Sequence, residues 1–406
     1  MALAHTEQIM KLLIAIPALN EEDAIESIIE RSLAAREQII AGSPVTAVDI
    51  TVVSDGSTDK TVERAGKYGD KIKLIVFEKN RGYGAAIKEA WRQSDADLLG
   101  FVDADGTCDP NFFAPLCATI EKERADVVLG CRINSESQMP LIRRFGNFLF
   151  ATLLSTLSTT RVRDTASGMR VVRAASLGHI YPLPDGLHFT PAMSARAMLS
   201  SALKIVEINM SYHERVGESK LHPGKDGLRF LRVIIETAFL YRPSRPFGLV
   251  SLVMLLTAAA LMLPPVALYL QDQTVEEWMI YRFIVSALIG TGGMLCASAS
   301  YLSGRIAKVA LGDEVGDRDR SLTTRFFRAR GFWLVPALFT LGGIALVAGS
   351  LKERLITGQT DVHWSRFIVM SFALSFALNL AVTRAIDYVL DLLALRLSYW
   401  KTKSGP

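Results

Sequence analysis

The chain has 406 residues, of which 50% are hydrophobic and 21% charged, and its formal net charge is +4. This small basic excess argues against a nucleic-acid-binding protein, which concentrates basic residues on one face. The composition also excludes disorder along the whole length. The four cysteines form no CxxC pair, so we predict neither a disulfide framework nor a zinc ribbon, and interpret them as buried thiols of a reduced compartment.

The first 245 residues alternate short apolar runs with helix-like stretches. Strands are expected at residues 11–17, 50–53, 72–77, 98–102 and 127–129, and helices at 21–40 and 84–92, with Asn20 as the N-cap of the first helix. Strands that alternate with helices predict an α/β domain with a mostly parallel sheet. Ligands of such sheets bind beyond the carboxyl ends of the strands, where the polar clusters of this sequence fall.

Two aspartates, Asp103 and Asp105, directly follow the apolar strand expected at 98–102. Their mutual repulsion is explained by a hard divalent cation, Mg²⁺ or Mn²⁺, which prefers oxygen ligands and bridges to a diphosphate. The alternative is a solvated turn that caps the next helix, to which Asp109 would belong. No GxGxxG follows the first strand and no GxxxxGK[ST] occurs, which disfavours a Rossmann dinucleotide site and excludes a P-loop kinase.

Four apolar segments follow, at about 247–270, 283–303, 331–350 and 367–390. Each reaches the roughly 20 residues that cross a bilayer, although a buried soluble helix is the alternative. Basic residues gather at 304–330 and in the tail, while 271–279 has none, which places the N-terminal part and the C-terminus in the cytoplasm. We therefore expect a cytosolic catalytic domain (1–224), an amphipathic juxtamembrane helix (225–245) and an all-α membrane domain (246–406) that could also join copies of the chain.

Six motifs, taken together, resemble family-2 glycosyltransferases with the GT-A fold. In chain order they are IPALNEE (16–22), VSDGSTD (53–59), NRGYGAA (80–86), VDADG (102–106), DTASGMR (164–170) and RVGESK (215–220). The last two resemble the polyprenyl-phosphate branch, which includes dolichyl-phosphate mannose synthase. The resemblance covers roughly the first 245 residues and implies a nucleotide-sugar donor.

The resemblance also implies roles for individual residues. The donor would contact Pro17, Ala18, Asn20, Glu22, Asp55, Gly82, Asp103, Ala104, Asp105 and Ser219. The catalytic set would be Asp103, Asp105, Arg132, Arg215 and Lys220, with the metal on the two aspartates. Thr107 stands where lipid-linked members often carry Gln, which leaves the third protein ligand of the metal open.

The acceptor is the remaining question. Transfer to a hydroxyl needs a general base, but no Glu-Asp pair occurs between Asp109 and Arg245. A lipid monophosphate is largely dianionic at neutral pH and needs none. We therefore predict an inverting transferase that moves a hexose from a GDP- or UDP-sugar to polyprenyl (dolichyl or undecaprenyl) phosphate. The expected acceptor-phosphate contacts are Arg132, Arg143, Arg144 and Asn147.

Residues 145–157 and 225–239 have the pattern of helices that lie in a membrane surface, with core packing as the alternative. Arg143 and Arg144 could equally be snorkelling interfacial cations, and Asp164 is expected to fix a turn rather than to act as a base. Two other functions stay open: a glycosyltransferase that acts on a lipid hydroxyl, and a lipid-sugar carrier without catalysis.

Overall fold

The computed structural model describes residues 10–134, 141–158, 160–212, 223–272, 275–312, 322–357 and 364–403. The chain divides into two compact units, Met1–Tyr241 and Arg242–Pro406. The helix Pro223–Tyr241, which covers most of the juxtamembrane stretch expected at 225–245, belongs to the first unit, and residues 242–245 belong to the second.

The first unit contains a seven-stranded sheet in the order β3-β2-β1-β4-β6-β5-β7. Its strands are β1 (Lys11–Ala18), β2 (Ala47–Ser54), β3 (Lys73–Val76), β4 (Leu98–Val102), β5 (Val127–Cys131), β6 (Met169–Arg173) and β7 (Ile205–Asn209). All neighbouring pairs are parallel except those made by β6, which runs antiparallel to both β4 and β5. The predicted mostly parallel sheet is confirmed, and β6 and β7 are strands that the sequence analysis missed.

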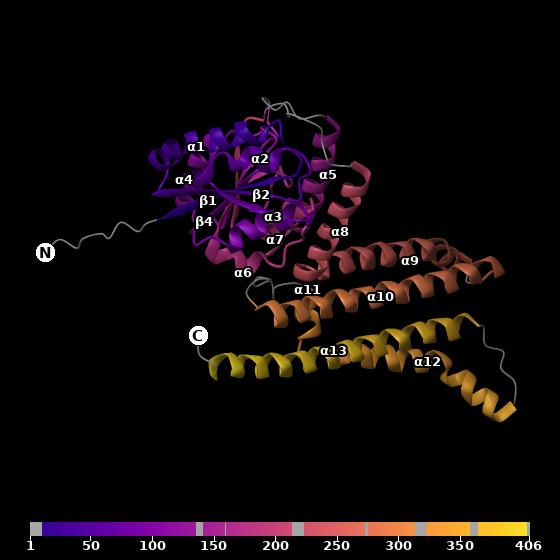
Figure 1. Cartoon of the computed structure of the whole chain (residues 1–406). Coiled ribbons are helices and arrows are strands. Elements are labelled where there is room, and N and C mark those ends of the chain that lie inside the picture. Colours follow the sequence, from indigo (N-terminus) through magenta and orange to yellow (C-terminus); the bar gives the residue numbers. More distant parts are fainter. Residues whose placement is uncertain are drawn as a thin grey trace. The chain divides into compact units, whose positions relative to one another are not determined.

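Helices cover both faces of this sheet, with α1 and α4 on one side and α3 and α7 on the other (Figure 1). The helices of the unit are α1 (Ile25–Gly42), α2 (Thr61–Gly66), α3 (Tyr83–Arg92), α4 (Phe113–Lys122), α5 (Leu141–Leu157), α6 (Leu177–Ile180), α7 (Phe189–Leu199) and α8 (Pro223–Tyr241). Strands β1 and β4 are apolar along almost their whole length because both of their faces are covered.

The N-cap predicted for the first helix is wrong. Helix α1 begins at Ile25 after Ala24, whereas Asn20 has a positive φ of 50° and lies in the preceding loop. Asparagine tolerates this left-handed conformation better than most residues. Asp109, which the alternative interpretation assigned to a capping turn, does cap the short 3₁₀ turn Pro110–Phe112, since its side chain accepts from the Asn111 backbone N–H.

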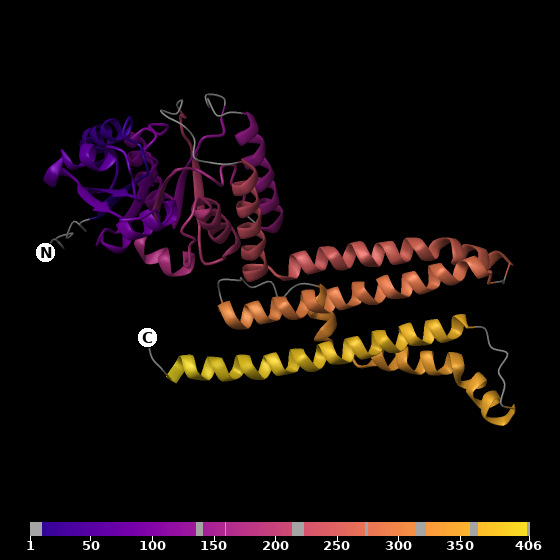
Figure 2. The same cartoon turned by 45° about the vertical axis from the view of Figure 1, so that its right-hand side comes forward.

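Helices α5 and α8 lie side by side in both views (Figure 1, Figure 2), joined by an edge-to-face contact between Phe150 and Phe230. Both helices expose large apolar side chains, namely Phe145, Phe148 and Leu149 on α5 and Leu228, Ile235, Phe239 and Leu240 on α8. The apolar residues of α8 differ in their exposure: Ile234 is buried and Leu231 half-buried, whereas Leu228, Ile235 and Phe239 are exposed. The two helices thus combine core packing with an apolar outer face.

The second unit is helical. It consists of α9 (Ser244–Asp272), α10 (Glu277–Leu311), α11 (Leu322–Phe327), α12 (Leu334–Thr357) and α13 (Ser365–Lys403). Within the described residues, three helices are long and apolar enough to cross a membrane: Ser244–Asp272, Glu277–Leu311 and Ser365–Tyr399. The apolar described part of α12, Leu334–Gly349, is shorter, so the span expected at 331–350 stays a prediction.

An ionic network with a buried centre, Arg305 and Asp387, joins α10 to α13 in this unit. Arg305 is 8% exposed and pairs with Asp387 at 2.9 Å and with Asp391 at 2.5 Å. Arg328, after α11, also contacts Asp391 at 2.6 Å. Buried charges are costly unless they are paired and hydrogen-bonded. This network therefore fixes how the two long helices and the segment after α11 pack.

Candidate active site

The loops that follow β1 and β2 are tied together by side chains from the first predicted motif. Asn20 Oδ1 accepts from the Thr58 backbone N–H at 2.8 Å. Glu22 Oε2 accepts from the Lys60 backbone N–H at 3.0 Å. Two of the predicted donor residues therefore brace the same loop after β2, at the carboxyl edge of the sheet.

Asp55 links this loop to the one before α3. Its carboxylate is 3% exposed and accepts from the backbone N–H of Arg81 at 2.6 Å and of Gly82 at 2.9 Å. Burial raises the pKa of Asp55, and these two hydrogen bonds oppose that rise. Gly82 has a φ of +107°, and a Cβ there would lie 2.4 Å from the Asp185 carbonyl oxygen. Only glycine fits this close approach.

Three other predicted donor residues lie in the sheet or directly at its edge. Pro17, Ala18 and Ala104 are all buried. Their side chains are therefore part of the core beneath the loops, and their backbone groups border the edge where the polar residues gather.

The aspartate pair lies at the end of β4, as predicted. Asp105 is 7% exposed, and its Oδ1 accepts from the Thr107 hydroxyl at 2.7 Å and from the Thr107 backbone N–H at 3.2 Å. Thr107, the residue that replaces the expected Gln, thus orients Asp105.

Asp103 lies in a narrow cradle formed by two residues that the sequence analysis did not single out. The Tyr83 hydroxyl donates to Asp103 Oδ1 at 2.6 Å. Burial and the neighbouring Asp103 carboxylate raise the pKa of Tyr83 well above its ordinary value, so the phenol remains a donor. Beneath the carboxylate lies Gly168, where a Cβ would be 1.9 Å from Asp103 Oδ2. Tyr83 lies in the motif NRGYGAA and Gly168 in the motif DTASGMR. Membership of these motifs was the sequence signal that could have identified them as site residues.

The donor chemistry of the pair fits a hard divalent cation. Within the described part of the chain, no group of three or more His, Cys, Asp or Glu side chains could hold a metal ion. Two neighbouring carboxylates suit Mg²⁺ or Mn²⁺, because Mg²⁺ commonly takes one or two carboxylates and completes its shell with substrate phosphates and water. Asp103 and Asp105 would be the protein ligands.

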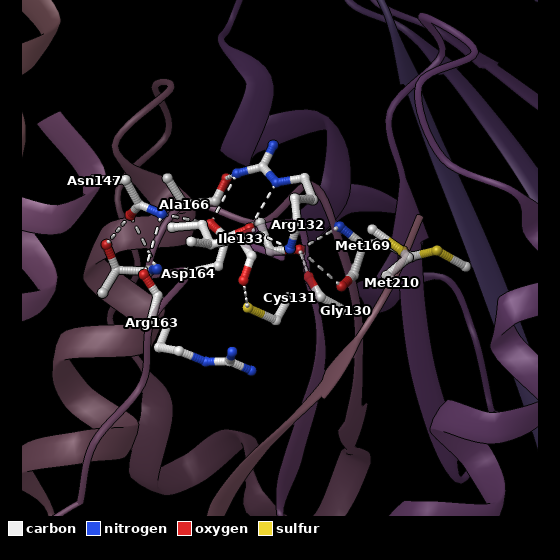
Figure 3. Close-up of polar contacts among 12 residues, drawn as sticks. Gly130, Cys131, Arg132, Ile133, Asn147, Arg163, Asp164, Ala166, Met169 and Met210 are labelled. Carbon is white, nitrogen blue, oxygen red and sulfur yellow. Dashed lines mark hydrogen bonds and ion pairs between the residues drawn. The ribbon is translucent and has the colours of Figure 1, made fainter. Parts of the chain in front are cut away.

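Arg132 follows β5 at the same edge and is held by Asp164 (Figure 3). Its Nε donates to Asp164 Oδ2 at 2.7 Å and its Nη2 to Asp164 Oδ1 at 2.9 Å. Asn147, on α5, donates from Nδ2 to Asp164 Oδ1 at 3.0 Å and is 7% exposed. Two predicted phosphate contacts, Arg132 and Asn147, are thus brought together around a shared aspartate.

An open groove of about 930 Å³ runs along α5. Apolar side chains, including Phe145 and Phe148, line it together with the cations Arg144, Arg161 and Arg163. All three arginines are exposed, and Arg163 also pairs with Glu207 at 2.6 Å. The groove combines an apolar wall with positive charge.

Several predicted site residues cannot be placed. Arg215, Ser219 and Lys220 lie outside the described residues, as does the side chain of Arg143. Their roles stay predictions.

A mostly parallel sheet with one reversed strand, and an aspartate pair at the carboxyl edge of its central strand, define a GT-A-type domain. The pattern of the family described as "Glycosyl transferase family 2" matches residues 13–180. The chain belongs to this family.

Curated relatives point to one branch of it. The chain is similar to the dolichyl-phosphate hexose transferase of Haloferax volcanii, with 31% identity over 229 residues, 55% of this chain and 92% of that protein. It is also similar to a low-salt glycan biosynthesis hexosyltransferase of the same organism, with 32% identity over 59% of this chain and 56% of that protein. A third relative, the dodecaprenyl-phosphate galacturonate synthase of Rhizobium johnstonii, is 25% identical over 75% of this chain and 86% of that protein. The predicted resemblance to the polyprenyl-phosphate branch is confirmed.

Among solved structures, the glucosyl-3-phosphoglycerate synthase of Mycobacterium tuberculosis is 20% identical and matches with a TM-score of 0.46 over 56% of this chain and 79% of that one.

Proposed function

We propose that the protein is an inverting, metal-dependent hexosyltransferase that moves a sugar from a GDP- or UDP-hexose to a polyprenyl phosphate at the cytoplasmic face of a membrane. The observation that carries this proposal is the aspartate pair, with Asp103 fitted between the Tyr83 hydroxyl and Gly168 at the carboxyl edge of the sheet. The names of the relatives support the class of acceptor, and three long apolar helices support attachment to a membrane.

The residues divide into a donor side and an acceptor side. Asp55 fixes the backbone at Arg81 and Gly82, which would let the donor approach that loop closely. Asp103 and Asp105 would hold the cation, which neutralises charge on the departing nucleoside diphosphate when it is bound. We also propose that Asp55 reads the nucleobase of the donor, as the family resemblance implies.

The acceptor phosphate supplies its own nucleophile. One of its oxygens forms a bond with the anomeric carbon of the sugar while the bond from that carbon to the diphosphate oxygen breaks, which inverts the carbon. No proton has to be removed, because the phosphate is largely dianionic at neutral pH. The protein then contributes orientation and charge, and Arg144 and Arg161 in the α5 groove are suited to attract the phosphate.

The test is an organic-extraction assay with the full-length protein in membranes. Several radiolabelled GDP- and UDP-hexoses are each supplied with undecaprenyl or dolichyl phosphate. We expect one donor to give organic-soluble label that mild acid releases, because a sugar phosphodiester is acid-labile. Acid-stable label would indicate a lipid hydroxyl as acceptor, and no turnover with any pair would favour a lipid-sugar carrier.

The groove yields a separate prediction about the lipid chain. Replacing the exposed Phe148 with Ser should raise the KM for polyprenyl phosphate about tenfold, since burying a phenylalanine contributes about 1.5–3 kcal/mol. The KM for the donor should stay the same. The control is Leu149→Ser, which changes a similarly exposed residue of α5 that is not among those lining the groove. Equal effects of both substitutions on the acceptor KM would show that the groove does not hold the chain.

A further inference from the structure

We propose that Asp164 is a positioning residue for the acceptor phosphate: its buried carboxylate orients the guanidinium of Arg132 and fastens helix α5 to the segment that supports Asp103. This inference rests on the proposed function, because it assigns how the acceptor end of the site is aligned with the donor end. It replaces the expectation that Asp164 only fixes a turn.

Asp164 holds Arg132 in a single orientation. Both carboxylate oxygens accept from the guanidinium, at 2.7 Å and 2.9 Å, and Oδ2 also accepts from the Arg132 backbone N–H at 3.0 Å. Arg132 Nη2 further donates to the Ala166 carbonyl at 2.7 Å. A bidentate pair of this kind fixes a planar guanidinium in direction as well as in place.

The orientation leaves one edge of the guanidinium for another ligand. The bonds to Asp164 and Ala166 use Nε and Nη2, and the third nitrogen points away from them (Figure 3). Ile133, the next residue along the chain, lines the α5 groove. Arg132 is therefore the residue directly before one that lines the groove proposed to take a phosphate with an apolar tail.

The same aspartate fastens α5. Asn147 donates to Asp164 Oδ1 at 3.0 Å, and its own Oδ1 accepts from the Thr165 hydroxyl at 2.9 Å and backbone N–H at 3.1 Å. These bonds are buried, since Asn147 is 7% exposed and Asp164 and Thr165 are 0% exposed. Helix α5, which forms the wall of the groove, is thereby joined to residues 164–165.

The connection continues to the donor side. Arg170 is fully buried and donates from Nη2 to the Thr165 carbonyl at 2.8 Å and from Nε to the Ser167 carbonyl at 3.1 Å. Between these two carbonyls and Arg170 lies Gly168, which supports the Asp103 carboxylate from beneath. A displacement of Asp164 would therefore shift both Arg132 on the proposed acceptor side and the support of Asp103 on the donor side.

The first test is Asp164→Asn, which keeps the shape of the side chain but leaves the Arg132 cation buried without a counter-charge. We expect the KM for polyprenyl phosphate to rise at least tenfold and kcat to fall about 100-fold, since small misplacements of positioning groups have effects of this size. The melting temperature should also fall. Amide hydrogen exchange in residues 141–157 should become faster because the anchor of α5 is weakened.

The second test separates positioning from stability. The double variant Asp164→Asn with Arg132→Gln removes both charges, so the melting temperature should recover. Transfer should stay impaired, because the Arg132 guanidinium proposed to contact the acceptor phosphate is gone. Recovery of kcat and acceptor KM along with the melting temperature would overturn the proposal, since the pair would then be structural only.

Asp126→Asn is the matched control. Asp126 lies directly before β5, whereas Arg132 lies directly after it, so the two residues are at opposite edges of the sheet. The Asp126 carboxylate accepts hydrogen bonds from the Ser176 hydroxyl and from the Lys204 backbone N–H. We expect no change in acceptor KM from this substitution. If the unmodified protein transfers no sugar with any donor and acceptor pair, the proposed function fails, whereas unchanged exchange in α5 of Asp164→Asn would count against the positioning role by itself.

Discussion

Replacing Asp105 with Asn is expected to lower the rate of sugar transfer by about 10²- to 10³-fold, the size of effect seen when one preorganised electrostatic group is lost from an active site. The substitution keeps the oxygen that accepts from Thr107 but removes a negative charge and one anionic metal ligand. We expect the residual activity to require a higher concentration of Mg²⁺ or Mn²⁺ for half-saturation, which a metal titration of initial rates would measure.

A matched control lies just before the same strand, β4. Asp95 precedes β4, pairs with Lys11 at the other edge of the sheet and has a side chain that is 84% exposed. Asp95→Asn removes the same charge about one strand length away and should leave transfer within twofold of the unmodified protein, as is usual for exposed ion pairs. Equal activity of Asp105→Asn and Asp95→Asn, with no change in metal dependence, would rule out the metal role of the aspartate pair.

Adding one methyl group at Gly168 is expected to be nearly as damaging. A Cβ would lie 1.9 Å from Asp103 Oδ2 and 2.5 Å from its Cγ, so the carboxylate must move from its position against the Tyr83 hydroxyl. A displacement of about 1 Å in such a group lowers rates on the order of 10²-fold. Gly168→Ala should therefore lower kcat by about this factor, measured in the same extraction assay.

Gly178→Ala provides the comparison, because a Cβ at this position in α6 meets nothing within 4 Å. It should leave both transfer and melting temperature close to those of the unmodified protein. Tyr83→Phe should lower activity less than Gly168→Ala does. The reason is that Tyr83→Phe removes only a hydrogen bond to Asp103, whereas the added methyl group displaces the carboxylate. Full activity of Gly168→Ala would mean that Asp103 need not occupy its observed position.

The carboxyl edge of the sheet could be predicted because it depends on local pattern. Apolar runs identify β1, β2 and β4, and the parallel order of βαβ units brings their polar ends together. Asp55 and the pair Asp103 and Asp105 accordingly lie where the sequence analysis expected them.

The proposed acceptor side was harder to predict from the sequence, because its geometry depends on contacts between residues that are far apart in the chain. Strand β6 has five residues, and only its placement between β4 and β5 shows that it runs in reverse. That reversal brings Asp164 to Arg132, a partner 32 residues away in the sequence. The pattern of charges around Arg132 does not reveal such a partner, so its role was predicted without the residue that orients it.

Reversal of β6 also limits which changes in length the site can tolerate. Met169 pairs with Val102, and the residues just before it form both the support beneath Asp103 and the partner of Arg132. An inserted or deleted residue between 164 and 169 would either break these contacts or slip the strand by one position, which turns every side chain of β6 to the opposite face. The fully buried Arg170 would then exchange places with an apolar neighbour. Insertions and deletions should therefore be tolerated better in the loops at the opposite edge of the sheet.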